Sequence, residues 1–268
     1  MQFQDILLVS DLDGTLIGKD FIVPQRNIAA VKRFKEEGGN FAIATGRAVD
    51  SGARYYSVAT PNAPCVLLNG SLVYDFDTKQ VLSEYPLPLG AVGYLQKVIE
   101  RFPTCGVEVY TKDKIYILKA NKYIEAHMKH EGLPCKECKI SDIPDKWDKT
   151  LFAADADVKS EMLQFVSTIG HEGVRFVSSS EYYIEMLPEY ADKGSGLTEL
   201  IHLTGFKREN VYAIGDYYND SEMLEAAGFA AVPANAPDDI KEMADLVVGH
   251  CYDGAVADLI EYIERKVK

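Results

Sequence analysis

The feature that most constrains this chain is the stretch at residues 6–16, ILLVSDLDGTL. Its first four residues are apolar and β-forming, which is typical of a strand buried on both faces, as in a parallel sheet. The apolar run stops at Ser10, and two aspartates, Asp11 and Asp13, follow at once. Open α/β sheets bind their ligands outside the carboxyl ends of the strands. The two carboxylates are therefore candidates for a functional site, although an aspartate before Gly14 is equally typical of a plain turn.

Three further apolar runs are each followed by polar residues. Residues 41–44 precede a Thr-Gly-Arg triplet, residues 65–68 precede an Asn-Gly pair, and residues 211–214 precede the sequence GDYYND. The polar residues at these run ends are Thr45, Gly46, Arg47, Asn69, Asp216, Asn219 and Asp220. Apolar residues at helical spacing between the runs predict strand–helix–strand crossovers, which are parallel and right-handed by default. We therefore expect an α/β fold with a Rossmann-like, doubly wound parallel sheet, and these polar residues at its carboxyl edge.

From about residue 84 to residue 187 the pattern changes. Apolar periodicity there predicts helices over 91–102, 123–130 and 161–169, and strands over 106–110, 115–118, 150–154, 174–177 and 182–186. A mixed segment inserted into a βαβ series indicates a second domain with its own sheet. We expect a discontinuous core domain of residues 1–83 and 188–268, and an inserted α/β cap domain of residues 84–187.

The charge and the apolar content limit the possible partners. The chain has 41 acidic and 28 basic residues, a net charge of −13, which argues against nucleic acid or an anionic membrane as a partner. Its apolar runs all fall short of the ~18–20 residues of a membrane span. The start, MQFQD, lacks the basic region of a signal peptide, and an odd number of cysteines, five, fits reduced thiols. These features favour a cytoplasmic protein without membrane attachment.

One group in the expected cap has metal-ligand spacing. His127 and His130 share a helix face, and Cys135 and Cys138 form a Cys-x-x-Cys pair. A zinc site would need a loop geometry that fits the tight span from His130 to Cys135, and the nearby lysines indicate a solvated surface. A structural zinc site and a set of unconnected surface features are both open, and the second is favoured.

If the strands are parallel, one edge of the sheet carries four carboxylates: Asp11, Asp13, Asp216 and Asp220. Two carboxylates ~4 Å apart repel each other by about 4 kcal/mol at an effective dielectric constant near 20, so four of them require a cation. A ligand set of oxygen atoms alone favours Mg²⁺ over zinc. Lys193 and the hydroxyl of Thr45 add a positive charge and donors that suit a phosphate dianion. Together these parts predict phosphoryl transfer with a carboxylate as the nucleophile.

The chain resembles the haloacid dehalogenase superfamily of phosphohydrolases in four short motifs that occur in the same order: DLDGT, TGR, a lysine (Lys193) and GDxxND. The large insert between the second and third motifs resembles the Cof-type sugar-phosphatase branch, as do Asn69 and Gly70 after the third strand. Asn235 and the later Asp-Gly pair at residues 253–254 also fit that branch. The motifs span both ends of the chain, whereas the insert matches in size and rough pattern only.

The resemblance implies a role for each matching residue. Asp11 would attack phosphorus and become an aspartyl phosphate. Asp13 would protonate the leaving alcohol and then activate the water that cleaves the intermediate. Thr45 and Lys193 would hold the phosphate, which the backbone at Gly46 can approach closely.

The same resemblance implies a Mg²⁺ cofactor. Asp11, Asp216 and the backbone carbonyl of Asp13 would bind the ion, and Asp220 would support it directly or through water. Asn219 would help to place the phosphoryl group.

Two further residues are candidates for substrate binding, Asn69 and Arg47. An exposed position on a helix would explain Arg47 equally well. The cap would close over the site as a lid and recognise the leaving group.

The resemblance thus implies a Mg²⁺-dependent phosphatase for small phosphate monoesters, such as sugar phosphates, pyridoxal phosphate or flavin mononucleotide. A phosphotransferase would use the same residues and pass the phosphate to another hydroxyl. A receiver-type signalling domain also clusters carboxylates, a Thr and a Lys, but such domains are about half this length and take the phosphate after the third strand. A non-catalytic phosphosugar-binding protein would not need Asp11 and Asp13.

Overall fold

The structure is a computed structural model that describes residues 3–18, 21–112, 114–170 and 172–267. It divides the chain into two compact units. The first consists of Met1–Gly46, Ala53–Ser83 and Asp192–Lys268, and the second of Arg47–Gly52 and Glu84–Ala191. This division differs from the expected domain limits at residues 47–52 and 188–191, which group with the second unit.

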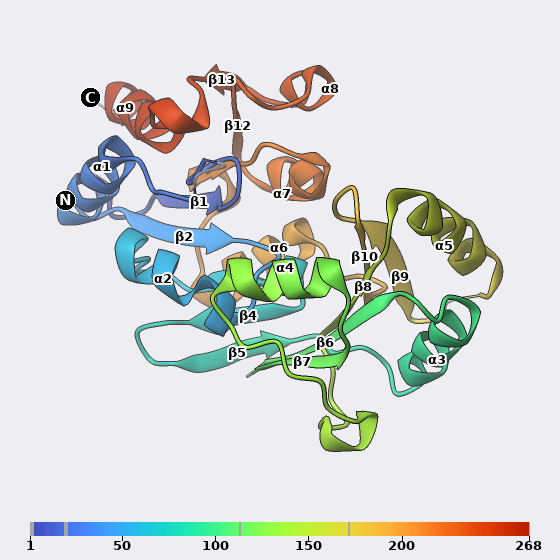
Figure 1. The fold of residues 1–268 in the computed structure, drawn as a ribbon. Coiled ribbons are helices and arrows are strands. Elements are labelled where there is room, and N and C mark those ends of the chain that lie inside the picture. Colours follow the sequence, from blue (N-terminus) through green and yellow to red (C-terminus); the bar gives the residue numbers. More distant parts are fainter. Residues whose placement is uncertain (1–2, 19–20, 113, 171, 268) are drawn as a thin grey trace. The chain divides into compact units, whose positions relative to one another are not determined.

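The first unit is built on an eight-stranded sheet in the order β13-β12-β11-β1-β2-β3-β4-β5 (Figure 1). The strands from β13 to β3 run parallel, and β4 returns antiparallel to β3. The strands are β1 (Leu7–Asp11), β2 (Asn40–Ala44), β3 (Cys65–Leu67), β4 (Leu72–Asp75), β5 (Gln80–Glu84), β11 (Val211–Ile214), β12 (Phe229–Pro233) and β13 (Leu246–Val248). The α/β class and the parallel sheet are as predicted.

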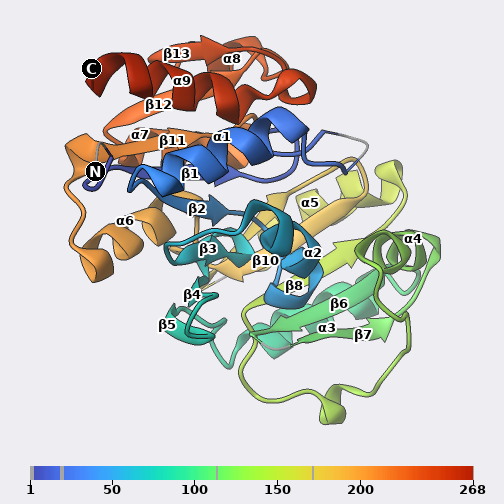
Figure 2. The same cartoon turned by 90° about the vertical axis from the view of Figure 1, so that its left-hand side faces the viewer.

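Helices cover both faces of this sheet (Figure 2). They are α1 (Gln25–Glu36), α2 (Val49–Ala59), α6 (Lys193–Thr204), α7 (Ser221–Ala226), α8 (Asp238–Lys241) and α9 (Ala255–Val267). Leu7 and Val9 of β1 pack into a core with Leu197 of α6, while Leu8 points to the opposite face, where α1 and α9 pack together. Because both faces are covered, β1 is a continuous apolar run. No helix in the described residues is long and apolar enough to cross a membrane.

The helix α6 begins at Lys193, although two glycines, Gly194 and Gly196, lie in its first turn. Lys193 is the first residue of the helix, and the side chain of Asp192 caps it by accepting a hydrogen bond from the backbone N–H of Ser195 at 2.7 Å. A Cβ at Gly194 would lie 2.3 Å from the carbonyl oxygen of Glu222, so only glycine fits there. The glycines therefore allow close packing and do not mark a loop. Lys193 is consequently fixed at a helix terminus.

The second unit has its own five-stranded antiparallel sheet in the order β7-β6-β8-β10-β9. The strands are β6 (Gly106–Thr111), β7 (Lys114–Lys119), β8 (Lys149–Ala153), β9 (Val174–Ser178) and β10 (Tyr183–Pro188), and the helices are α3 (Ala91–Arg101), α4 (Lys122–Glu131) and α5 (Ala156–Thr168). Apolar side chains of α3 and α5 pack on one face of this sheet. Side chains that alternate with these along each strand point to the other face of the sheet. Among them are two buried charged groups, Glu108 of β6 and Glu185 of β10.

Candidate active site

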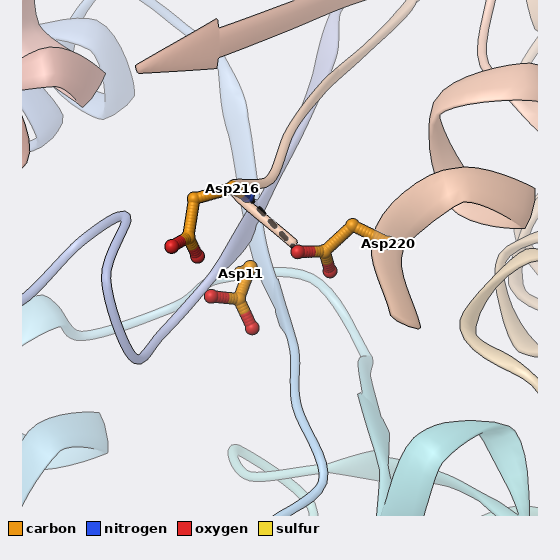
Figure 3. A group of neighbouring side chains, drawn as sticks. All are labelled: Asp11, Asp216 and Asp220. Atoms are coloured by element: carbon orange, nitrogen blue, oxygen red, sulfur yellow. Dashed lines mark hydrogen bonds between the residues drawn. The ribbon is translucent and has the colours of Figure 1, made fainter. Parts of the chain in front are cut away.

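Three aspartates meet at the carboxyl edge of the first unit's sheet. Asp11 is the last residue of β1, and Asp216 follows the neighbouring parallel strand β11 by two residues. Asp220 closes the short 3-10 helix Tyr218–Asp220. Figure 3 shows the three carboxylates gathered at one point, and each offers an oxygen atom within 4.8 Å of the others. Asp13, the fourth predicted carboxylate, is exposed and lies outside this group.

Lys193 ties two of these carboxylates together. Its Nζ donates to Oδ1 of Asp11 and to Oδ1 of Asp220, both at 2.6 Å, and its side chain is only 1% exposed. An ammonium group at the first residue of a helix is disfavoured by the helix dipole. Burial alone would lower the pKa of Lys193, but Asp11 and Asp220 raise it above its ordinary value. The lysine is therefore charged, and its ion pairs with the two aspartates hold its side chain in position.

Hydrogen bonds fix the directions of the other two acids. Asp220 Oδ2 accepts from the backbone N–H groups of Asp216 and Tyr217, at 3.0 and 3.1 Å. The hydroxyl of Thr15 donates to Asp216 Oδ1 at 3.1 Å, a contact across 201 residues of sequence. The sequence analysis assigned no role to Thr15, because nothing along the chain indicates a contact with the distant Asp216. The carboxylates are thus held in place, a prerequisite for ligand binding.

The electrostatics of the cluster favour an added cation. Burial raises the pKa of Asp11 well above its ordinary value, and the charges of Asp220 and Asp216 raise it further against the opposing effect of Lys193. Burial and the charge of Asp220 raise the pKa of Asp216 to about 6. Three carboxylates accompany one ammonium group, so the fully ionised cluster carries a net charge of −2. Its ligand atoms are all oxygen, and the cluster can therefore bind a hard divalent cation such as Mg²⁺.

The residues predicted to form a phosphate cradle also come together. Thr45 follows β2, the other neighbour of β1, and is buried. Its backbone carbonyl accepts from the backbone N–H of Asn69 at 3.0 Å. Asn69 is buried with a φ of 55°, and a Cβ at Gly46 would lie 3.0 Å from its Oδ1, so the glycine permits this close approach. Thr45, Gly46 and Asn69 therefore form one compact group at the same edge of the sheet.

Two further candidate residues are Arg47 and Asn219. Arg47 belongs to the second unit, where its Nη1 pairs with Glu131 Oε1 at 2.5 Å and its side chain is 10% exposed. The expectation of an exposed helical arginine is therefore wrong, because Glu131 neutralises and covers the guanidinium. Asn219 is exposed in the 3-10 helix between the two metal-binding candidates Asp216 and Asp220.

The histidine and cysteine group does not form a metal site. Among the described residues, three potential ligand atoms converge only at Asp11, Asp216 and Asp220. His127 Nδ1 instead lies 3.0 Å from Oε1 of Glu108, while Cys135 is exposed. Spacing along the chain was the sole signal for zinc, and it carries no information on where the side chains point.

A parallel α/β sheet with a carboxylate cluster, a buried lysine and a threonine cradle at its carboxyl edge is typical of proteins that carry out phosphoryl transfer. The family model of the haloacid dehalogenase-like hydrolases matches residues 8–260. The chain belongs to this family. It is an enzyme of the class that hydrolyses phosphoric monoesters, which confirms the interpretation of the four sequence motifs.

Similar proteins match along almost the whole chain. The chain is 26% identical to pyridoxal phosphate phosphatase YbhA of Escherichia coli, over 95% of this chain and 97% of that protein. It is 27% identical to 5-amino-6-(5-phospho-D-ribitylamino)uracil phosphatase YitU of Bacillus subtilis, over 98% and 99%. The crystal structure of a haloacid dehalogenase-like hydrolase from Bacteroides thetaiotaomicron superposes with a TM-score of 0.89 at 25% identity, over 96% and 99%. These matches include the insert as well as the core.

Proposed function

We propose that the protein is a Mg²⁺-dependent phosphatase of small phosphate monoesters that works through an aspartyl phosphate on Asp11. The observation that carries this proposal is the buried contact of Lys193 with both Asp11 and Asp220 inside a cluster of excess carboxylates. Such an arrangement holds a carboxylate nucleophile beside a fixed cation, and the remaining negative charge suits a metal ion.

The metal ion would be held by the side chains of Asp11, Asp216 and Asp220 and by the backbone carbonyl of Asp13. Bound Mg²⁺ would offset the excess carboxylate charge, keep Asp11 ionised and polarise the oxygens of the phosphoryl group. The all-oxygen donor set of the three aspartates supports this assignment.

In the first half of the reaction, a carboxylate oxygen of Asp11 attacks phosphorus and forms an acyl phosphate bond. The bond between phosphorus and the ester oxygen breaks, and Asp13 gives its proton to the leaving alcohol. Asp13 suits this task because its side chain is exposed and stands outside the carboxylate cluster.

In the second half, Asp13 accepts a proton from a water molecule as the water oxygen attacks phosphorus. The acyl phosphate bond breaks, Asp11 regains its carboxylate, and inorganic phosphate leaves. Lys193 and the hydroxyl of Thr45 would stabilise the charge on the phosphoryl oxygens in both halves.

Further contacts to the phosphoryl group would come from the Thr45–Asn69 group and from Asn219. Gly46 would let the backbone approach the anion. The guanidinium of Arg47 forms an ion pair with the carboxylate of Glu131. Arg47 is therefore a candidate phosphate ligand only if this ion pair breaks when the substrate binds.

The substrate is proposed to be a small metabolite ester, such as a sugar phosphate. Two relatives are named for pyridoxal phosphate and for a phosphorylated ribitylaminouracil, which are small phosphate esters. We propose that the second unit acts as the specificity domain, since the core residues described above account for the phosphate group and leave the alcohol to be recognised elsewhere.

The test is phosphate release from a panel of small phosphate esters by the wild-type protein and by Asp11→Asn, with Mg²⁺ and with EDTA. We expect release that requires Mg²⁺ and is lost in the variant. Release that survives Asp11→Asn would overturn the nucleophile assignment. An acceptor alcohol added to the assay distinguishes a phosphatase from a phosphotransferase. A phosphotransferase would yield a phosphorylated acceptor in place of free phosphate.

A further inference from the structure

We propose that Asn235 is a positioning residue that aims the carboxylate of Asp216 at the metal position. The inference rests on the proposed function, because it assigns a role to Asn235 through the metal ligand Asp216. It concerns the first unit alone.

Asn235 connects three loops at the carboxyl edge of the sheet. It follows β12 by two residues, and its Nδ2 donates to the carbonyl oxygen of Gly14 at 2.9 Å. The same Nδ2 lies 3.4 Å from Oδ2 of Asp216 as a second, longer contact. Its Oδ1 accepts from the backbone N–H of Cys251 at 3.0 Å. One carboxamide therefore joins the loops that follow β1, β11 and β13.

The two oxygens of Asp216 are held from different directions. Thr15 donates to Oδ1 and Asn235 donates to Oδ2. Between these donors lies Gly14, where a Cβ would be 2.4 Å from Oδ2 of Asp216. The bond from Asn235 to the carbonyl of Gly14 keeps this loop close to the carboxylate. Removal of Asn235 would thus take one of two donors from the carboxylate and one restraint from the Gly14 loop.

Asp216 needs such a restraint because its neighbours are acids. Repulsion from Asp220 and Asp11 favours rotation of its side chain away from the cluster in the absence of a metal ion. The hydrogen bonds from Thr15 and Asn235 oppose that rotation. Partners of this kind, which orient a metal ligand without touching the metal, typically change metal affinity by about 10–100-fold when they are removed.

A merely structural role predicts something different. If Asn235 served only to hold the loop at Cys251, its removal would lower thermal stability and leave metal affinity unchanged. Asn62 provides a matched control, because it also joins two backbone groups: its Oδ1 accepts from Phe41 N–H at 2.8 Å and its Nδ2 donates to the carbonyl of Gly39 at 3.1 Å. Asn62 precedes β3, at the amino ends of the strands and away from the aspartates.

The experiment measures Mn²⁺ binding to the substrate-free protein by electron paramagnetic resonance, with Mg²⁺ as the competitor. The variants are Asn235→Ala, Asn235→Leu, which keeps the branched shape of the side chain without its polar atoms, and Asn62→Ala. Thermal melting in EDTA establishes that each variant is folded. We expect both Asn235 variants to bind the metal ions about 10–100-fold more weakly, and Asn62→Ala to bind them as the wild type does.

Two results would overturn the inference, and they are distinguishable. If the wild type binds metal and a folded Asn235 variant binds it within twofold as well, Asn235 does not position Asp216, and the proposed function stands. If the wild type binds neither Mn²⁺ nor Mg²⁺, the metal site itself is refuted, and the inference falls with the proposed function.

Discussion

Both units bury charged side chains, but the charges are arranged differently. In the second unit, three acids each pair with a base: Glu108 with His127, Glu131 with Arg47, and Glu185 with Lys149. In the first unit, the buried cluster of Asp11, Asp216 and Asp220 accompanies one base, Lys193. The acid and the base of each pair offset each other's charge, whereas the cluster of aspartates carries an excess of negative charge.

The difference separates structural from functional charge. Buried ions that pair one to one offset each other's desolvation and require no outside partner. An excess of one sign is unfavourable in the folded protein by itself and persists where a ligand of opposite charge binds. On this basis we propose that the aspartates form the reactive site and that the ion pairs of the second unit organise its polar sheet face.

The largest expected effect is the loss of activity in Asp11→Asn. The amide keeps the shape of the side chain but cannot attack phosphorus, so phosphate release at saturating Mg²⁺ should fall by at least about a thousandfold. Because the variant removes one of the excess charges, its melting temperature in EDTA should equal or exceed that of the wild type. A variant that keeps more than a tenth of the wild-type activity would contradict the assigned role.

Neutralising an acid in the second unit should have the opposite effect on stability. Glu185→Gln removes the ion pair of Glu185 with the buried ammonium of Lys149 and should destabilise the second unit by about 3 kcal/mol. The chain's single tryptophan, Trp147, is buried in this unit, so its fluorescence during urea unfolding reports the change.

The matched control for that variant replaces both partners. Lys149→Met with Glu185→Leu removes the pair without leaving a buried charge, and it should recover most of the lost stability. Equal destabilisation by the single and the double variant would show that packing, and not charge balance, dominates at this position.

Mg²⁺ should stabilise the protein through the aspartates. At a concentration one hundred times its dissociation constant, a ligand that binds only the folded state adds about 2.7 kcal/mol. Differential scanning calorimetry should therefore show a higher melting temperature in Mg²⁺ than in EDTA. Asp216→Asn should abolish most of this shift, and a shift of wild-type size in that variant would place the ion elsewhere.

The smallest expected effect concerns His127. Burial lowers its pKa, but the hydrogen bond and charge of Glu108, together with Glu131, raise it above the ordinary value of 6.5 against the opposing charge of Lys149. A raised pKa stabilises the folded state fully below pH 6.5, and this contribution is lost as the pH rises through the raised pKa. The wild type should lose about 1 kcal/mol between pH 6 and pH 9 that His127→Gln does not lose.

Urea unfolding followed by Trp147 fluorescence at the two pH values measures this effect. The comparison of variant with wild type removes the contributions of other groups that titrate in the same range. An identical pH dependence in both proteins would show that folding does not raise the pKa of His127.

The sequence was sufficient for the class of fold and for the edge of the sheet at which the aspartates of the candidate site meet. Apolar runs such as residues 6–9 and 211–214 predict buried parallel strands because both faces of such strands are covered. Each motif is contiguous, so its residues stay together whatever the rest of the chain does. Parallel strands then bring the ends of β1 and β11 to the same edge, as their register requires.

Tertiary structure decided the contacts between residues far apart in the chain. Lys193 reaches Asp11 across 182 residues, and Arg47 pairs with Glu131 across 84. The spacing of His127, His130, Cys135 and Cys138 was compatible with a metal site, yet His127 faces Glu108. Periodicity along a segment determines which residues share a face of that segment. Which partner that face meets, and in which direction each side chain points, depends on how the separate elements pack.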